Sequence, residues 1–364
     1  MKILRTYILK EIIGPLLISI SIFTFLLLTG NMLKLADMIV NKGVSILYIG
    51  RLFILLIPYV LSYTIPMSLL TATMICFGRL SSDNELTAMR ATGISFYSIA
   101  APVLILGLII SLGGVYLNDR ILPASHFKSY KLIKKIGVEK PTAYLEAGTF
   151  IKSFKGYIVF IHSIDENKLN DIRIYQLQND GPTRTIVAES GEIITQPEKN
   201  IVKLKLNNGT ADEPNPSNPS IFYKLNFRTY YMSLNLENTL NESQIEKKPK
   251  DMTIKELKDE ISKFKSQKID PTPLIIEIHR KIAMAFSSFI FVLVALPLAI
   301  NTRRREKSVG FGMSIILLTI YYLLLIGGQA LALKGLLTPI TGIWLANILY
   351  FAAGTVMIFV ITEK

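Results

Sequence analysis

Six uncharged and predominantly apolar stretches divide the chain. Each is long enough to cross the hydrocarbon core of a bilayer, which is about 30 Å thick and takes roughly 20 helical residues. The first stretch is too long for the apolar part of a secretory signal peptide, so we expect it to remain as an anchor. The pattern predicts six transmembrane helices, at residues 12–33, 52–77, 94–118, 282–302, 308–333 and 335–362.

A different pattern fills the long segment between the third and fourth stretches. Apolar and polar residues alternate there over short runs, as in strands with one buried face. The clearest runs are residues 156–164, 171–177 and 202–206, and Asn208-Gly209 after the third run is typical of a hairpin turn. We expect about six to eight short strands in a small sandwich, jelly roll or open barrel.

Two helical connectors flank these strands. Thr253 and Glu256 form a capping box at the start of one helix, and residues 127–136 form a basic extension of the third transmembrane helix. The sequence thus predicts a polytopic α-helical membrane protein with six transmembrane helices and an inserted all-β, jelly-roll-like domain. The expected division is helices in residues 1–118, the inserted domain in 119–281, and helices again in 282–364.

The net charge and its distribution along the chain limit the kinds of partner that we expect the protein to bind. Half of the residues are hydrophobic, 18% are charged, and the formal net charge is +13. Residues 140–250 hold 14 Lys or Arg against 13 Asp or Glu, so the excess lies beside the apolar stretches. A nucleic-acid-binding protein would gather basic residues on its soluble domain, so we expect no nucleic acid as partner. The basic residues at the N-terminus, at Arg79 and Arg90, and at 303–305 predict that both termini are cytoplasmic and the inserted domain is not.

The sequence contains no motif for catalysis, metal binding or nucleotide binding. Its three histidines are scattered, Cys76 is its single cysteine, and H-E-x-x-H, G-x-S-x-G and the P-loop pattern are all missing. We therefore expect no catalytic residue, no metal site and no cofactor. The apolar stretches also lack interior acidic residues, which argues against a proton relay. If the protein moves a cargo, the energy must come from another protein.

The loop of residues 78–93 is the most informative segment. Ser82 and Glu85 resemble a capping box, Leu86 and Met89 lie on one face, and Gly93 is a suitable stop, which together predict a helix over residues 82–93. So short a helix is unstable alone in water and needs a surface to dock on. Either Glu85 only caps the helix while Leu86 and Met89 touch lipid headgroups, or the helix inserts into a groove of a cytoplasmic partner.

Several separated motifs resemble the LptF/LptG family of lipopolysaccharide-export permeases. They are Glu-Leu-Thr-Ala-Met-Arg-Ala-Thr-Gly-Ile-Ser at 85–95, His-Arg-Lys-Ile-Ala at 279–283, Leu-Pro-Leu at 296–298, the arginines 303–305, Ser-Val-Gly-Phe-Gly at 308–312 and Trp-Leu-Ala-Asn at 344–347. The order of helices and inserted domain is also similar to the family over the whole chain. Nothing in one sequence says which of the family's two paralogous types this is, or whether it forms a homodimer or a heterodimer.

The resemblance implies a task. Members of this family are non-catalytic subunits of an ABC-type exporter in the inner membrane of Gram-negative bacteria. They pair with a second permease subunit and a cytoplasmic ATPase dimer that binds the ATP, and they pass lipopolysaccharide through a periplasmic jelly roll towards a periplasmic bridge protein. The resemblance gives Glu85 the role of coupling residue, and the same segment adds Leu86, Met89 and Arg90 to the contact with the ATPase.

Lipopolysaccharide carries phosphates, so its cavity needs a cationic rim. Lys34, within Leu-Lys-Leu-Ala-Asp at 33–37, is similar to the family's lysine that approaches these phosphates, and Lys42, Lys128 and Lys131 could extend the rim. The alternative is that these lysines anchor helix ends at the membrane surface. Pro58, Pro66 and Pro297 are either hinges of the cavity or static bends, and the sequence does not separate the two.

Other classes remain to be weighed. A lipoprotein-releasing permease usually has four spans with the large domain after the first, which disagrees with an insertion at residues 119–281. An envelope sensor or scaffold with a ligand-binding β domain is compatible with the same pattern. A membrane-bound enzyme is disfavoured by the missing catalytic set.

Overall fold

A computed structural model describes most of the chain, in residues 2–139, 148–151, 156–165, 168–176, 183–196, 201–215, 218–235, 247–301 and 307–362. Within these residues, six helical segments are long and apolar enough to cross a membrane. The predicted polytopic α-helical class with an inserted β domain is therefore confirmed. The arginines at 303–305, which support the predicted orientation, lie outside the described residues.

Three of the six membrane helices are much longer than the apolar stretches that predicted them, and the other three begin and end within four residues of theirs. The helices are α1 (Lys2–Val40), α2 (Ile46–Ser82), α4 (Phe96–Tyr116), α8 (Thr272–Asn301), α9 (Lys307–Leu333) and α10 (Pro339–Thr362). A π-helical turn, Leu117–Ile121, joins α4 directly to α5 (Leu122–Glu139), so the third span leads without a break into the basic extension. The extra turns of α1, α2 and α8 carry the charged residues that flank the apolar cores.

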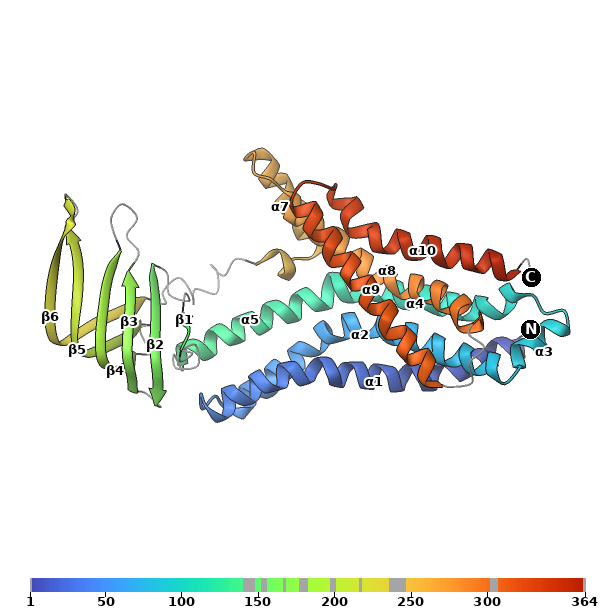
Figure 1. The fold of residues 1–364 in the computed structure, drawn as a ribbon, viewed down its shortest axis with the longest axis horizontal. Coiled ribbons are helices and arrows are strands. Elements are labelled where there is room, and N and C mark those ends of the chain that lie inside the picture. Colours follow the sequence, from blue (N-terminus) through green and yellow to red (C-terminus); the bar gives the residue numbers. More distant parts are fainter. Residues whose placement is uncertain are drawn as a thin grey trace. The chain divides into compact units, whose positions relative to one another are not determined.

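The chain forms two compact units, each with its own core. The first contains residues 1–31, 55–127 and 247–364, and the second contains residues 32–54 and 128–246. In the first unit α8 is the most buried span and packs against both α4 and α10 (Figure 1). Phe291 of α8 is fully buried and meets the rings of Tyr321 in α9 and Tyr350 in α10. The other spans expose much of their apolar surface, as expected of helices that face lipid or another membrane subunit.

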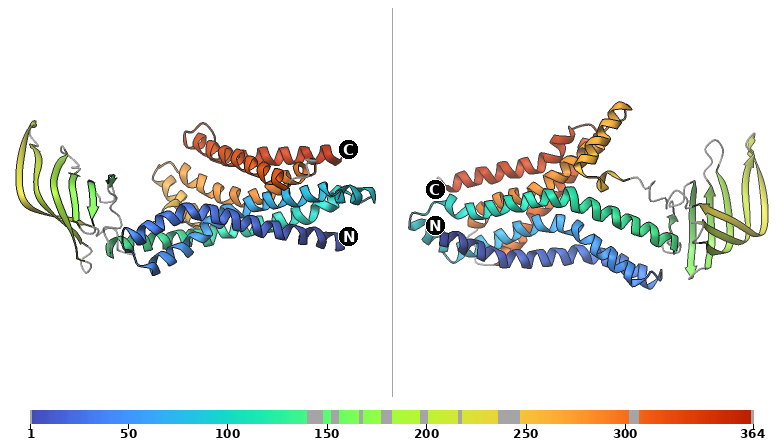
Figure 2. Two further views of the ribbon diagram at one scale, coloured as in Figure 1. Left: turned by 60° about the horizontal axis from the view of Figure 1, so that its bottom comes forward. Right: turned by 180° about the vertical axis from the view of Figure 1, so that it is seen from behind.

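The second unit contains an open antiparallel sheet of six described strands in sequential order. Its strands are β1 (Phe150–Ile151), β2 (Tyr157–Asp165), β3 (Lys168–Gln176), β4 (Arg184–Gln196), β5 (Ile201–Asn215) and β6 (Asn218–Asn235). They lie in a single curved layer (Figure 2). One face buries branched aliphatic side chains, including Val159, Ile174 and Leu206. Of the expected β architectures, the described strands form the open one.

The predicted hairpin turn at Asn208-Gly209 is wrong, because β5 continues through both residues. Leu206 pairs with Tyr230, and Thr210 pairs with Asn226, on either side of the expected turn. Asn208 adopts a left-handed conformation with φ of 50°, which bends the strand without reversing it. A Cβ atom at Gly209 would lie 2.4 Å from the ring of Phe227, so glycine lets this aromatic ring cover the strand.

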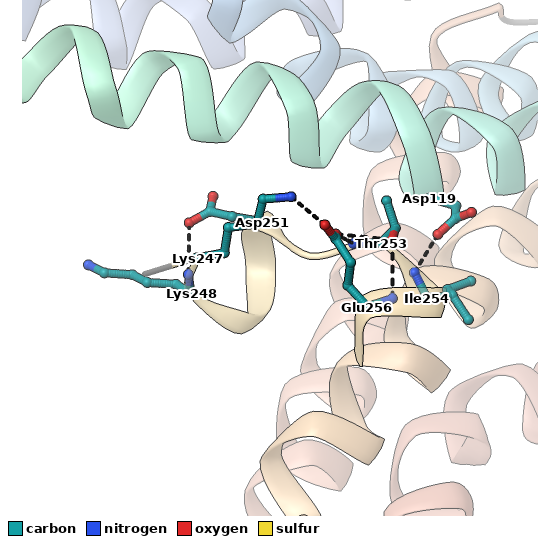
Figure 3. A network of polar contacts seen from close by, with 7 residues as sticks. All are labelled: Asp119, Lys247, Lys248, Asp251, Thr253, Ile254 and Glu256. Atoms are coloured by element: carbon teal, nitrogen blue, oxygen red, sulfur yellow. Dashed lines mark hydrogen bonds and ion pairs between the residues drawn. The ribbon is translucent and has the colours of Figure 1, made fainter. Parts of the chain in front are cut away.

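A polar network holds residues 247–256 of the helical unit in place (Figure 3). Thr253 caps α7 (Ile254–Ser266) as predicted: its backbone N–H donates to Glu256 Oε2 at 2.7 Å, and its hydroxyl accepts from the Glu256 N–H. Asp119, in the π-helical turn, accepts from the Ile254 N–H at 2.6 Å. Partial burial alone would raise the pKa of Glu256, but hydrogen bonds from Lys247 and Thr253 lower it below its ordinary value. Leu257 then packs against Leu274 and Ile278 of α8.

Candidate functional site

The short helix between the second and third spans is α3, Glu85–Ala91. Its stop is as predicted: Gly93 has φ of 82°, its N–H donates to Arg90 O, and the Ile94 N–H donates to Met89 O. The predicted capping box is wrong. Because α2 continues through Ser82, the residue before α3 is Asn84, which is left-handed and makes no side-chain cap.

The two apolar residues of α3 face the core of their own chain. Leu86 is only 4% exposed and belongs to the core of the helical unit, and Met89 packs against that core. Arg90, Thr87 and Ala88 are exposed. Leu86 and Met89 therefore anchor α3, while the exposed residues form the surface that a partner can meet.

Glu85 is held by a residue that the sequence analysis did not identify. The Tyr7 hydroxyl donates to Glu85 Oε2 at 2.7 Å, and among the described residues Oε1 has no hydrogen-bond partner. Glu11, one helical turn after Tyr7, forms an ion pair with Arg79 at the end of α2. Ile8 and Ile12, the residues that follow Tyr7 and Glu11, are fully buried in the core of the helical unit. The spacing of Tyr7 and Glu11 on one face of α1 was a visible signal, but the sequence alone did not show what that face touches.

A second group of charged residues surrounds an apolar cluster in the other unit. Val44, Ile49, Leu52 and Ile136 are buried there, with Leu35 and Leu132 packed against them. This cluster joins the end of α1, the start of α2 and the middle of α5. It therefore brings together the segments that carry Lys34, Lys42 and Lys131, with Lys128 one turn earlier on α5. We call these four lysines, together with Arg51, Lys134 and Lys135, the basic cluster.

Positive charge exceeds negative charge in the basic cluster. The segments that carry it contain only Asp37 and Glu139 as acidic residues. Lys42 pairs with Asp37 at 3.6 Å, Lys134 lies 4.8 Å from the centre of the Tyr130 ring, and Lys135 lies 5.9 Å from that of Tyr48. Lys34 and Lys128 are exposed, and Lys131 is half-buried. Such an arrangement attracts anionic groups through its summed field and through individual lysines.

Buried charge at the start of α8 was also missed by the sequence analysis. Lys281 is 4% exposed, and its ammonium donates to the Asn118 carbonyl at 3.1 Å, while the Asn118 amide donates to the Lys281 carbonyl. Arg280 pairs with Glu277 on the same helix. These contacts join α8 to the π-helical turn. No group of three or more His, Cys, Asp or Glu that could hold a metal lies among the described residues.

The chain is similar in sequence to proteins of one known family. Residues 6–360 match the family described as "Lipopolysaccharide export system permease LptF/LptG". The chain is 21% identical to the Lipopolysaccharide export system permease protein LptF of Escherichia coli K12 over 358 residues, which is 98% of this chain and 94% of that protein. The Shigella flexneri LptF matches equally. The uncharacterized protein RP871 of Rickettsia prowazekii is 26% identical over 194 residues, and this match spans about half the length of each chain (53% and 54%).

Proposed function

Because the chain belongs to the LptF/LptG family of lipopolysaccharide export system permeases, we propose that it is a membrane-spanning subunit of an ATP-driven exporter. In this proposal the subunit lifts lipopolysaccharide out of the inner membrane and passes it through its periplasmic β domain towards the outer membrane. The observation that carries the proposal is the family match over residues 6–360, which includes every span and the β domain.

Family membership itself fixes several coarser properties. The chain is a multi-pass membrane protein, and it belongs to an inner-membrane family of permease subunits. As a permease of this family it works with a second LptF/LptG-type subunit. The large exposed apolar surfaces of α1, α9 and α10 are compatible with such a partner as well as with lipid, because helices associate in a bilayer through close side-chain packing and not through burial of apolar surface.

In the proposed cycle, α3 transmits the force of ATP hydrolysis. A separate cytoplasmic ABC ATPase dimer binds the nucleotide, so this chain needs no cofactor of its own. The Glu85 carboxylate meets a basic residue of the ATPase, and exposed Arg90 extends the contact. Burial of Leu86 and Met89 supports the assignment, because an anchored α3 moves together with the core of the helical unit when the ATPase pulls on it.

The basic cluster is the proposed contact for the phosphates of the lipid. In the proposed orientation both termini are cytoplasmic, so Lys34, Lys42, Lys128 and Lys131 lie on the periplasmic side, where the positive-inside rule does not account for them. A lysine beside a phosphate forms a charge-assisted hydrogen bond. A periplasmic bridge protein then receives the lipid from the β domain.

Reconstitution tests this function against the alternative of a sensor or scaffold. The chain is purified with the proteins that co-purify with it, placed in liposomes loaded with lipopolysaccharide, and supplied with ATP or with a non-hydrolysable analogue. We expect a P-loop ATPase in the purified complex and release of lipopolysaccharide only with ATP. Binding of lipopolysaccharide without any ATP-dependent release would favour the sensor, and ATP-driven release of a lipoprotein instead would favour the lipoprotein-releasing permease.

A further inference from the structure

Two separate contacts, one ionic and one neutral, hold the side chains around Glu85. Tyr7 and Glu11 of α1 each contact a charged side chain, Glu85 of α3 and Arg79 of α2 respectively. Arg79 pairs with Glu11, and Glu85 receives a neutral donor, the Tyr7 phenol. The carboxylate thus has no cationic partner among the described residues, and its oxygen Oε1 has no hydrogen-bond partner among them.

We infer that Tyr7 and Glu11 are positioning residues for the coupling carboxylate. Glu11 occupies Arg79 and so prevents an internal ion pair between Arg79 and Glu85. Tyr7 holds Glu85 through Oε2 and directs Oε1 towards a cation of the cytoplasmic partner. This inference rests on the proposed function, because it assumes that Glu85 meets the ATPase.

The geometry separates this role from mere support of the fold. The first turns of α1 are anchored by Ile8 and Ile12, which are fully buried in the core of the helical unit. The packing of α1 therefore does not depend on the Tyr7 hydroxyl, and a phenylalanine at this position keeps the ring. Likewise, Arg79 is more than a third exposed, so solvent stabilises its charge when Glu11 is removed.

An unpaired carboxylate is the better ligand for an external cation. If Arg79 captured Glu85, the partner would have to break that ion pair before it could bind, and the coupling contact would weaken. If Glu85 had no internal contact, the side chain would lose rotamer entropy when the partner bound. A single neutral hydrogen bond avoids both costs, because it orients the carboxylate and does not neutralise it.

The test uses the full complex in liposomes and measures lipopolysaccharide released per ATP hydrolysed. We expect Tyr7→Phe to lower this ratio by about 2- to 10-fold, the range expected for loss of one hydrogen bond. Glu11→Gln lowers it at least as much, and the double variant Glu11→Gln/Arg79→Gln recovers most of the loss. Tyr97→Phe is the matched control, because Tyr97 is an exposed tyrosine at the start of α4 and contacts neither Glu85 nor Glu11.

Three outcomes decide the question. If Glu85→Gln leaves the ratio at the wild-type value, the coupling role in the proposed function fails. If Glu85→Gln lowers the ratio while Tyr7→Phe and Glu11→Gln do not, the proposed function stands and this inference is overturned. If the double variant fails to recover, the role of Glu11 is overturned. Adding Tyr7→Phe to Glu85→Gln should cause no further loss, since a residue that acts through Glu85 has nothing left to position.

Discussion

The region around Glu85 and the basic cluster differ in how their charged side chains are arranged. Around Glu85 the contacts are specific: Glu11 pairs with Arg79, and the neutral Tyr7 hydroxyl donates to Glu85. In the basic cluster the cations outnumber the acids, and Lys34 and Lys128 are exposed. The first region depends on the position of one carboxylate, whereas the second depends on the sum of many charges. Single substitutions should therefore have large effects in the first region and graded effects in the second.

The two regions also differ in how they are attached. Leu86 places α3 directly on the main core of the helical unit, which also contains residues of α1, α2, α4 and α8. The basic cluster rests on a smaller apolar cluster around Val44, Leu52 and Ile136. A site that transmits force needs the rigid attachment, while a site that receives a large, variable anion works with long and solvated lysines.

Reversal of charge at Glu85 should have the largest effect. Glu85→Arg removes the acceptor of Tyr7 and places a cation opposite the proposed cation of the ATPase. Loss of a hydrogen-bonded charge pair at an interface costs about 2–5 kcal/mol, so we expect ATP-dependent release of lipopolysaccharide from liposomes to fall about 30-fold or more. Tyr97→Arg, at an exposed position at the start of α4 and outside the exposed surface of α3, is the control for added charge. Wild-type release by Glu85→Arg would remove the distinction between the two regions.

Loss of the anchor of α3 should be nearly as damaging, but through stability. Leu86→Ala removes a buried side chain, and truncation of this kind costs about 2–5 kcal/mol. We expect a lower thermal unfolding temperature of the detergent-solubilised protein and faster proteolysis within residues 83–95. Thr87→Ala, on the exposed side of α3, should change neither. Equal behaviour of the two variants would mean that α3 is not anchored through Leu86.

The sequence predicted the spans and the β domain because both depend on long repeating patterns. Apolar length predicted all six helices, and the three alternating runs correspond to β2, β3 and β5. Local motifs were less reliable. The capping box of Thr253 formed, but that of Ser82 did not, because α2 extends further than its apolar core. Asn208-Gly209 bends a strand instead of ending it, because Phe227 of the neighbouring strand covers the glycine.

From the sequence, the only candidate-site residues that could be predicted were those in a recognisable motif or beside an apolar stretch. Glu85 stood out within its motif, and the four lysines stood out by their position beside apolar stretches. Tyr7, Glu11 and Arg79 did not, because their partners are far apart in sequence and the pairing exists only once α1 packs against α2 and α3. The buried contact of Lys281 with Asn118 has the same cause.

Substitution of one lysine should have a moderate and salt-dependent effect. Lys34 is exposed, and an exposed charge pair contributes about 0.2–1 kcal/mol, so Lys34→Ala should weaken binding of lipopolysaccharide by a few-fold. The loss should add to that of Lys128→Ala and should shrink at high salt, as screening reduces both. Binding is measured on the protein in nanodiscs, with Lys34→Arg as the control that keeps the charge. A loss as large as that of Glu85→Arg would show that Lys34 acts by position, like Glu85.

Removal of an acidic residue should have opposite consequences in the two regions. Its effect on the basic cluster is the smallest effect that we expect. Asp37 pairs with Lys42 at 3.6 Å and is half exposed. Asp37→Asn releases Lys42 from this pair and raises the local positive charge, so lipopolysaccharide should bind about two-fold more tightly. Asp83→Asn, an equal change of charge at an exposed residue beside α3, should leave binding unchanged. Glu11→Gln, by contrast, should impair export, because the acid it removes keeps Arg79 away from Glu85. If Asp37→Asn also impaired binding, Lys42 would need its acidic partner to be held in place, and the basic cluster would then depend on geometry as much as the surroundings of Glu85 do.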